Sequence, residues 1–358
     1  MGTTDALVTR LIRPEIRALS AYHVADAAGY VKLDAMENPY VWPEDMRLDW
    51  LARLQTVAMN RYPDPAPARL KALLREADGI PDGMALLLGN GSDEIIQMLL
   101  MAVAGPEVSV LAPEPTFVMY RQIARSLGLN FIGVPLAADF SLDLAAMTAA
   151  ISEHKPALVF LAYPNNPTGN LFERQAVEAI LAATPGLVVL DEAYAPFAEA
   201  TFMRDLPNYP NLLVMRTLSK LGLAGLRLGY LAGTPAWIDE LDKVRLPYNI
   251  NVLTQVTVEF ALEHHTVFDM QTENLRRDRE KLFQALQALP GFTPLPSRAN
   301  FILFRCDDRP AAEIFDALKR GGILIKNLSG AGGPLTDCLR VTVGTPDENR
   351  RFLAALPA

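Results

Sequence analysis

A single lysine in an apolar, glycine-containing stretch is the first residue whose surroundings suggest chemistry. Lys220 lies in 217-TLSKLGLAGLRLGY-230, where no acidic residue accompanies it. Lysine loses its charge readily when it is removed from water, and the neutral amine is a nucleophile. Lys220 is therefore a candidate for covalent catalysis as well as a possible surface charge.

Two further segments place polar groups where ligands bind. Asp191 ends the apolar run 187-LVVLD-191, and an ionised carboxylate there is costly unless it meets a cation or a donor, for example a pyridinium nitrogen. The loop 161-LAYPNNPTGN-170 is stiffened by prolines and offers the amides of Asn165 and Asn166. This loop also fits an ordinary Asx-turn that leads into the next helix.

The segment 89-GNGSDEIIQML-99 follows a predicted strand and opens an amphipathic helix. Ser92, Asp93 and Glu94 would occupy the first turn, where free backbone N–H groups and the helix dipole favour an anion. A simple capped helix has the same pattern. Glu94 stands where a dinucleotide-binding motif needs its third glycine, and no P-loop sequence exists to support a nucleotide hydrolase.

The elements that must position these residues alternate between strands and helices from about residue 84 to 245. Apolar runs predict strands, and helical periodicity between them, as in 116–128 and 172–184, predicts covering helices. We therefore expect an α/β fold with a mostly parallel sheet, whose strand ends would bring Lys220, Asp191, Asn166 and the Ser92 turn to one crevice. The predicted strands are 84–89, 107–112, 130–135, 157–163, 187–194, 212–217 and 227–233.

After residue 250 the pattern changes to that of a smaller α+β unit. Helices are predicted at 251–265, 268–289 and 310–321, and strands at 300–305, 322–326 and 339–344. We expect an N-terminal arm of residues 1–30, a small domain formed by 31–58 and 251–358, and a large cofactor-binding domain of 59–250.

Composition excludes several classes of function. The chain has 358 residues, half of them hydrophobic, and a formal net charge of −8, which argues against nucleic acid or an anionic membrane as partner. The most apolar run, 95–104, is too short to span a bilayer, and the start lacks a signal-peptide pattern.

Only two cysteines occur, Cys306 and Cys338, which fits a reducing cytoplasm. His264 and His265 are adjacent and so poorly spaced for a metal, and no metal is expected.

The order of G-S-D-E, P-N-N-P-T-G, D-E-A-Y, S-K and L-R-V-T-V-G resembles the fold-type I pyridoxal-phosphate aminotransferases. With R-Y-P-D-P at 61–65, the chain most resembles the histidinol-phosphate aminotransferase subgroup. The resemblance implies amino transfer from histidinol phosphate to 2-oxoglutarate in histidine biosynthesis, by a homodimer that carries pyridoxal 5'-phosphate. Aromatic aminotransferases and threonine-phosphate decarboxylases are similar enough to remain alternatives. A non-catalytic cofactor-binding module of a regulator fits less well, because few residues precede 31-VKLDAMENPY-40.

The resemblance also implies roles for individual residues. Lys220 would bond the cofactor covalently and then move the substrate proton, Asp191 would hold the ring nitrogen protonated, and Asn166 and Tyr194 would donate to the ring's phenolic oxygen. The remaining cofactor contacts would come from Ser92, Asp93, Glu94, Thr217, Ser219 and Arg227 at the phosphate, Phe117 on the ring, and Tyr62 from a second subunit. Substrate would be bound by Tyr22, Asn38, Asn166, Lys326 and Arg340.

The sequence departs from the subgroup at three points. The loop from Lys220 to Arg227 is one residue shorter than is common, which puts the reach of Arg227 to the phosphate in question. Phe117 stands where tyrosine is frequent. Lys326 replaces the usual arginine, and because an ammonium group is a point charge, bidentate phosphate binding would be lost there.

Overall fold

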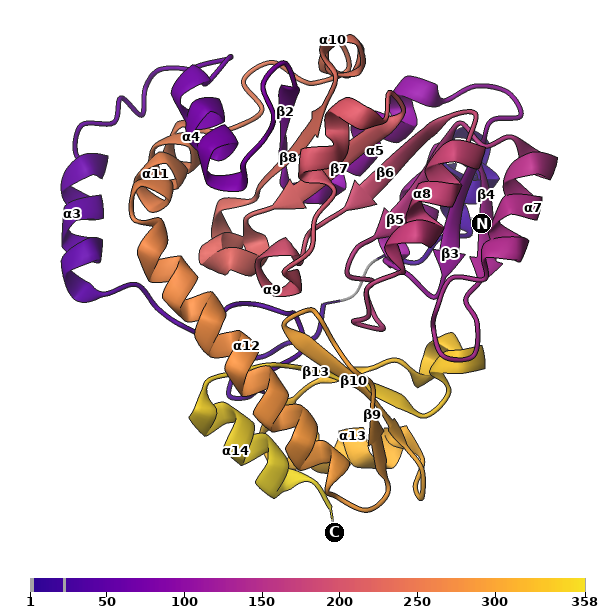
Figure 1. Ribbon diagram of the computed structural model, residues 1–358, viewed down its shortest axis with the longest axis vertical. Helices are drawn as coiled ribbons and strands as arrows, with labels where there is room; N and C mark the ends of the chain where they lie inside the picture. Colours follow the sequence, from indigo (N-terminus) through magenta and orange to yellow (C-terminus); the bar gives the residue numbers. More distant parts are fainter. Residues whose placement is uncertain (1–2, 22–23, 358) are drawn as a thin grey trace.

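A seven-stranded sheet forms the centre of the computed structural model, which describes residues 3–21 and 24–357 (Figure 1). The strand order is β2-β8-β7-β6-β5-β3-β4, and all strands are parallel except β8, which runs antiparallel to both neighbours. The strands are β2 (Ala85–Asn90), β3 (Ser109–Glu114), β4 (Asn130–Pro135), β5 (Leu158–Ala162), β6 (Leu187–Asp191), β7 (Leu212–Thr217) and β8 (Leu228–Gly233).

Helices cover both faces of this sheet, as expected for strands that are buried on both sides. One face packs against α5 (Gly91–Val103), α6 (Val118–Ser126) and α10 (Pro235–Asp242). The other face packs against α4 (Ala68–Asp78), α7 (Leu144–His154) and α8 (Arg174–Ala183). The predicted α/β fold with a mostly parallel sheet is confirmed, including each of the seven strands.

Two predicted strands differ from the structure by more than a shift of one or two residues at an end. The strand predicted at 187–194 ends at Asp191, because the Ala195 N–H donates to the Glu192 carbonyl at 2.9 Å and the chain turns into α9 (Ala195–Ala198). The strand predicted at 322–326 is divided into β11 (Ile323–Leu324) and β12 (Lys326–Asn327), which pair with different sheets.

The C-terminal part forms the expected α+β unit, seen below the large sheet in Figure 1. Its antiparallel sheet has the order β12-β13-β10-β9, and β1 (Val31–Lys32) pairs in parallel with β11. The segment that follows residue 30 is thereby joined to the C-terminal unit. The other elements of this unit are α12 (His265–Gln287), β9 (Phe292–Pro294), β10 (Phe301–Cys306), α13 (Ala311–Arg320), η4 (Ser329–Ala331), η5 (Gly333–Leu335), β13 (Cys338–Thr342) and α14 (Pro346–Ala355).

Two helices that were expected in the small domain pack with the large sheet's hydrophobic core. Met46 of α3 (Glu44–Leu54) and Val258 and Phe260 of α11 (Val252–Glu263) belong to the same cluster as α4 and α8. The domain boundaries at residues 58 and 250 therefore stay a prediction. The arm contains α1 (Thr3–Leu11) and α2 (Pro14–Arg17), and Arg13 donates to the Ser126 carbonyl at the end of α6.

Candidate active site

A cavity of about 360 Å³ lies where the sheet's strand ends meet the C-terminal unit. The strands β5, β6 and β7 deliver residues to it at or just beyond their carboxyl ends, as is usual for ligand sites in parallel sheets. Most of the residues that the sequence singled out line this cavity: Ser92, Asp93, Phe117, Asn166, Asp191, Tyr194, Thr217, Ser219, Lys220 and Arg227.

The amino end of α5 forms one wall of the cavity and can hold an anion. Asn90 precedes the helix without capping it through its side chain, so the N–H groups of the first turn remain available. Gly91 has φ +78, and a Cβ atom there would lie 2.6 Å from an Arg227 nitrogen. A glycine at this position therefore lets the guanidinium lie directly against the helix end.

Arg227 reaches this wall despite the shorter loop that precedes it. Its guanidinium lies 3.6 Å from an Asp93 oxygen and 3.4 Å from Ser219 Oγ. Ser219 Oγ also lies 2.9 Å from Thr217 Oγ1, so two hydroxyls and one guanidinium converge beside the helix end. Such a set of donors suits a phosphate group.

Asp191 is a buried carboxylate that has hydrogen-bond donors but, within residues 3–21 and 24–357, no ion-pair partner. Tyr120 Oη donates to Asp191 Oδ2 at 2.6 Å, and the Ala193 N–H donates to Oδ1 at 3.1 Å. Burial raises the pKa of Asp191 from 3.8 to about 6, although these hydrogen bonds oppose the change. A protonated ring nitrogen at this position would supply the missing positive charge.

Lys220 lies on a π-helical turn, η2 (Ser219–Leu223), that is followed directly by η3 (Ala224–Leu226). Gly222 interrupts the turn with φ +125, a conformation that favours glycine. Lys220 Nζ donates to the Ala35 carbonyl at 3.2 Å and lies 5.9 Å from the centre of the Tyr194 ring. Burial, assisted by the positive charge of Arg340, lowers the pKa of Lys220 to about 8. The amine is therefore close to its neutral, nucleophilic form near physiological pH.

The two neighbouring asparagines have different tasks. The Asn165 side chain is fully buried, accepting from Thr116 Oγ1 at 2.8 Å and donating to Thr168 Oγ1 at 2.7 Å, so it holds the loop in shape. Asn166 faces the cavity instead, and its side-chain oxygen accepts a hydrogen bond from Arg340. Nothing in the residue type distinguished these two positions in the sequence.

Aromatic residues close the remaining sides. Phe117 directly precedes α6, at its N-cap position, and packs edge-on against Tyr120 with the ring centres 5.5 Å apart. Tyr194 packs edge-on against Phe301 at 5.2 Å, and burial raises its pKa above the ordinary value of 10. The Tyr194 hydroxyl therefore stays protonated across the physiological range and can donate a hydrogen bond.

Arg340 on β13 is buried and lies between the two parts of the chain. It donates to Asn166 and, at 3.1 Å, to the Asp34 carbonyl, and its guanidinium lies 5.2 Å from the centre of the Phe301 ring. Lys326 is the residue opposite Arg340 in the β12–β13 pair, and neither residue lines the cavity, although Arg340 contacts its lining residue Asn166.

Several other predicted residues lie outside the cavity lining. The Glu94 side chain accepts from the Asn90 N–H at 2.6 Å and from Asn249 at 3.0 Å, so it supports the loop before α5. Asn38 donates to the Leu221 carbonyl at 2.9 Å, next to Lys220. Tyr62 is 80% exposed and stacks on Tyr248 at 4.5 Å. Tyr22 lies outside the described residues.

Sequence reasoning missed residues on both sides of the cavity. Ala35, Met36 and Glu37 line it, brought there by the pairing of β1 with β11, which joins positions almost three hundred residues apart. Tyr120 was missed as the partner of Asp191. Its position three residues after Phe117, on the same helical face, was the available signal.

No group of His, Cys, Asp and Glu side chains within residues 3–21 and 24–357 is arranged to hold a metal ion. Within the same ranges, no helix has the length and apolar character needed to cross a membrane.

The residues fit pyridoxal phosphate. Asp191 is buried with hydrogen-bond donors but no ion-pair partner among the described residues, so the cavity contains a carboxylate that a cationic group of a ligand would complement. Its volume of about 360 Å³ lies within the range for cofactor pockets. The anion site, the acidic group and the lysine amine match the cofactor's phosphate, ring nitrogen and aldehyde.

The chain belongs to the aminotransferase class I and II family, whose model matches residues 30–356 and whose members depend on pyridoxal phosphate. It is 62% identical over 355 residues to histidinol-phosphate aminotransferase 2 of Nitrosococcus oceani, with 99% of each chain covered. It is 55% identical to histidinol-phosphate aminotransferase 2 of Cupriavidus pinatubonensis, covering 100% of this chain and 99% of that relative.

Solved structures agree with the family assignment. Histidinol-phosphate aminotransferase from Sinorhizobium meliloti, in complex with pyridoxal-5'-phosphate, has a TM-score of 0.86 at 26% identity and covers 97% of this chain and 96% of its own. L-threonine-O-3-phosphate decarboxylase from Porphyromonas gingivalis, at 23% identity and a TM-score of 0.75, covers 91% of this chain and 98% of its own and shares the fold. The resemblance inferred from the sequence motifs is confirmed.

Proposed function

We propose that this chain is a histidinol-phosphate aminotransferase that acts in histidine biosynthesis and passes the amino group to 2-oxoglutarate. The observation that carries the proposal is the 62% identity to a histidinol-phosphate aminotransferase over 99% of both chains. The cavity supports it, because a lysine, a buried carboxylate and an anion site are arranged there as amino transfer requires.

Pyridoxal phosphate, when bound, supplies an electron sink for the bond that breaks at the substrate carbon. Thr217, Ser219, Arg227 and the first turn of α5, which holds Ser92, Asp93 and Glu94, would bind its phosphate. The Asp191 carboxylate would accept a hydrogen bond from the protonated ring nitrogen. Asn166 and Tyr194 would donate to the phenolic oxygen, and Phe117 would pack against the ring.

Lys220 would perform the proton transfer. Its Nζ, with a pKa of about 8, is partly neutral at physiological pH and would accept the proton from the substrate carbon that carries the amino group. The Ala35 carbonyl holds the amine in the cavity, and Arg340 lowers its affinity for a proton.

Arg340 would bind the anionic group of each substrate in turn, the phosphate of histidinol phosphate or a carboxylate of glutamate. Its buried position strengthens such a contact because little water competes. Lys326, opposite Arg340, would add positive charge from outside the cavity, and Asn38 would act through the lysine loop that it contacts. Tyr22 is proposed for substrate binding from the sequence resemblance alone.

The working unit is proposed to be a homodimer in the cytoplasm. Tyr62 and Tyr248 form an exposed aromatic pair, which supports a contact with a second copy whose cavity Tyr62 would complete. Cys306 and Cys338 are both free thiols, as a reducing compartment favours.

The deciding experiment is an assay of the purified protein with 2-oxoglutarate and a panel of amino donors. Histidinol phosphate should give the highest kcat/KM, above aromatic amino acids, because they present no phosphate to Arg340. Preferential turnover of an aromatic amino acid, or carbon dioxide release from threonine phosphate, would contradict the proposal.

A further inference from the structure

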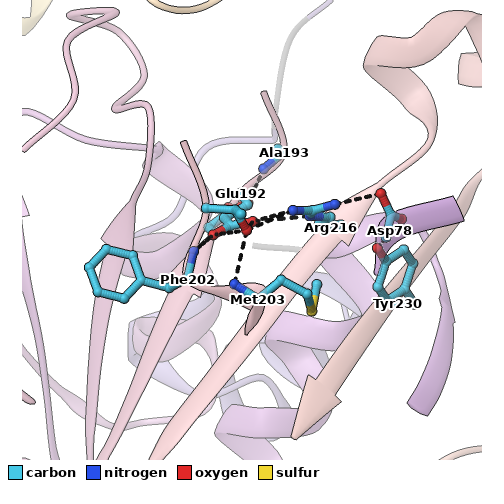
Figure 2. A network of polar contacts seen from close by, with 9 residues as sticks. Asp78, Glu192, Ala193, Phe202, Met203, Arg216 and Tyr230 are labelled. Carbon is cyan, nitrogen blue, oxygen red and sulfur yellow. Dashed lines mark hydrogen bonds and ion pairs between the residues drawn. The ribbon is translucent and has the colours of Figure 1, made fainter. Parts of the chain in front are cut away.

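A buried ion-pair network joins Glu192, directly after β6, to Arg216 on β7 (Figure 2), and neither residue lines the cavity. Arg216 Nε and Nη2 both donate to Glu192 Oε2, at 3.0 and 2.7 Å. The Glu192 side chain is fully buried, and that of Arg216 is 11% exposed. On its other side Arg216 donates to Asp78 at 2.5 Å, and Asp78 accepts from the Tyr230 hydroxyl.

Each of the two residues that form this ion pair is adjacent in the sequence to a residue of the site. Glu192 follows Asp191, and Arg216 precedes Thr217. Asp191 and Thr217 line the cavity, whereas Glu192 and Arg216 do not and instead line a second pocket, which Thr217 also borders. For Arg216 and Thr217 this follows from the alternation of side chains along β7. The Glu192 N–H also donates to the Met215 carbonyl at 2.8 Å, so backbone and side-chain contacts join the same two strand ends.

Glu192 is fixed by more contacts than pairing with Arg216 requires. Its carboxylate also accepts from the Phe202 N–H at 2.6 Å and from Thr201 Oγ1 at 2.8 Å. Burial alone would lower the pKa of Arg216, but Tyr230, Glu192 and Asp78 together raise it above the ordinary value. The side chains of Glu192 and Arg216 thus have no buried polar atom without a hydrogen-bond partner among the described residues.

We propose that the Glu192–Arg216 ion pair is a positioning device that fixes Asp191 and Thr217 for cofactor binding. This inference rests on the proposed roles of Asp191 at the ring nitrogen and Thr217 at the phosphate. The ion pair itself touches neither the cofactor nor the substrate. The ion pair fixes the separation between the ends of β6 and β7. Asp191 and Thr217 would therefore contact the ring and the phosphate of the cofactor at a fixed spacing.

Asp78 provides a matched control within the same network. Asp78→Asn removes a carboxylate from Arg216, as Glu192→Gln does, but Asp78 lies on α4 and is not a chain neighbour of any cavity residue. A merely stabilising network predicts similar consequences for the two substitutions. A positioning role predicts that only the change at Glu192 affects the cofactor.

The test compares the dissociation constant for pyridoxal phosphate, measured by titrating each full-length apoprotein, with that protein's thermal unfolding midpoint. By analogy with the hydrogen-bond partners of metal ligands, Glu192→Gln should weaken cofactor binding about tenfold or more. Asp78→Asn should change it less than about twofold, even where both variants unfold at the same lowered temperature.

A milder variant covers the case in which Glu192→Gln does not fold. Thr201→Val removes the hydroxyl that donates to Glu192 and accepts from Arg216 at 2.8 Å, and it should weaken cofactor binding in the same direction. Equal cofactor affinities in the Glu192, Thr201 and Asp78 variants would overturn the inference while leaving the proposed function intact. A wild-type protein that binds no pyridoxal phosphate would instead overturn the cofactor site, and this inference with it.

Discussion

Replacing Lys220 by methionine should make the apoprotein more stable at neutral pH. Burial lowers the pKa of Lys220 from 10.5 to about 8, so at pH 7 the folded protein holds a charged amine in an unfavourable place. The difference between these two values corresponds to about 3 kcal/mol. Loss of the hydrogen bond to the Ala35 carbonyl offsets about 1 kcal/mol, which leaves a net gain of about 2 kcal/mol.

The pH dependence of this gain has a definite sign. The unfolded chain keeps the lysine proton up to about pH 10.5, whereas the folded chain releases it near pH 8. Unfolding therefore takes up a proton between these values, and the folded wild type becomes more stable relative to the methionine variant as the pH rises. The advantage of the variant should shrink by about 2 kcal/mol between pH 7 and pH 9.5.

Urea unfolding of both apoproteins at equal concentration, at pH 7 and pH 9.5, measures this effect. Lys326→Met supplies the baseline for exchanging lysine for methionine outside the cavity. A Lys220→Met protein that is no more stable than the wild type at pH 7, or whose advantage does not change with pH, would refute the view that burial suppresses the charge on this amine.

Other residues of the site give further predictions. Asp191→Asn should raise the apoprotein's unfolding free energy at pH 7 by about 3 kcal/mol, because burial raises the pKa of this carboxyl to about 6. The same substitution should weaken cofactor binding about tenfold to a hundredfold. Denaturant titration measures the first effect and cofactor titration the second, and an unchanged cofactor affinity would contradict the role of Asp191. Arg340→Ala should lower kcat/KM about tenfold to a hundredfold with both histidinol phosphate and glutamate, whereas Lys326→Ala should lower it by a smaller factor. Wild-type rates for the Arg340 variant in stopped-flow half-reactions would contradict a role of Arg340 in substrate binding. The wild type should sediment as a dimer, and a fully active monomer would contradict the role proposed for Tyr62.

The sequence predicted well what depends on local pattern. The apolar runs gave all seven strands of the large sheet, and the polar residues at their ends, such as Asp191 and Asn166, line one cavity as parallel topology requires. Lys220 was recognisable because its neighbours are apolar, which is also the cause of its lowered pKa.

Features that depend on distant pairing were not predictable from the sequence. Ala35, Met36 and Glu37 reach the cavity only because β1 pairs with β11, and no local pattern specifies that partner. The strand that begins at Leu187 was predicted too long because the residue types at Glu192 and Ala193 are compatible with a strand. In the structure the strand ends at Asp191, and the chain turns where the Ala195 N–H donates to the Glu192 carbonyl.

The central claim is that this chain moves the amino group of histidinol phosphate with Lys220 as the proton carrier. A single-turnover experiment tests it most directly: the protein loaded with pyridoxal phosphate is mixed with histidinol phosphate alone, and the keto product is quantified against active sites. The wild type should form about one equivalent, while Lys220→Ala, which retains the phosphate and ring contacts, should form almost none. Full product formation by the Lys220→Ala protein, or none by a wild type that does react with another amino donor, would contradict the claim.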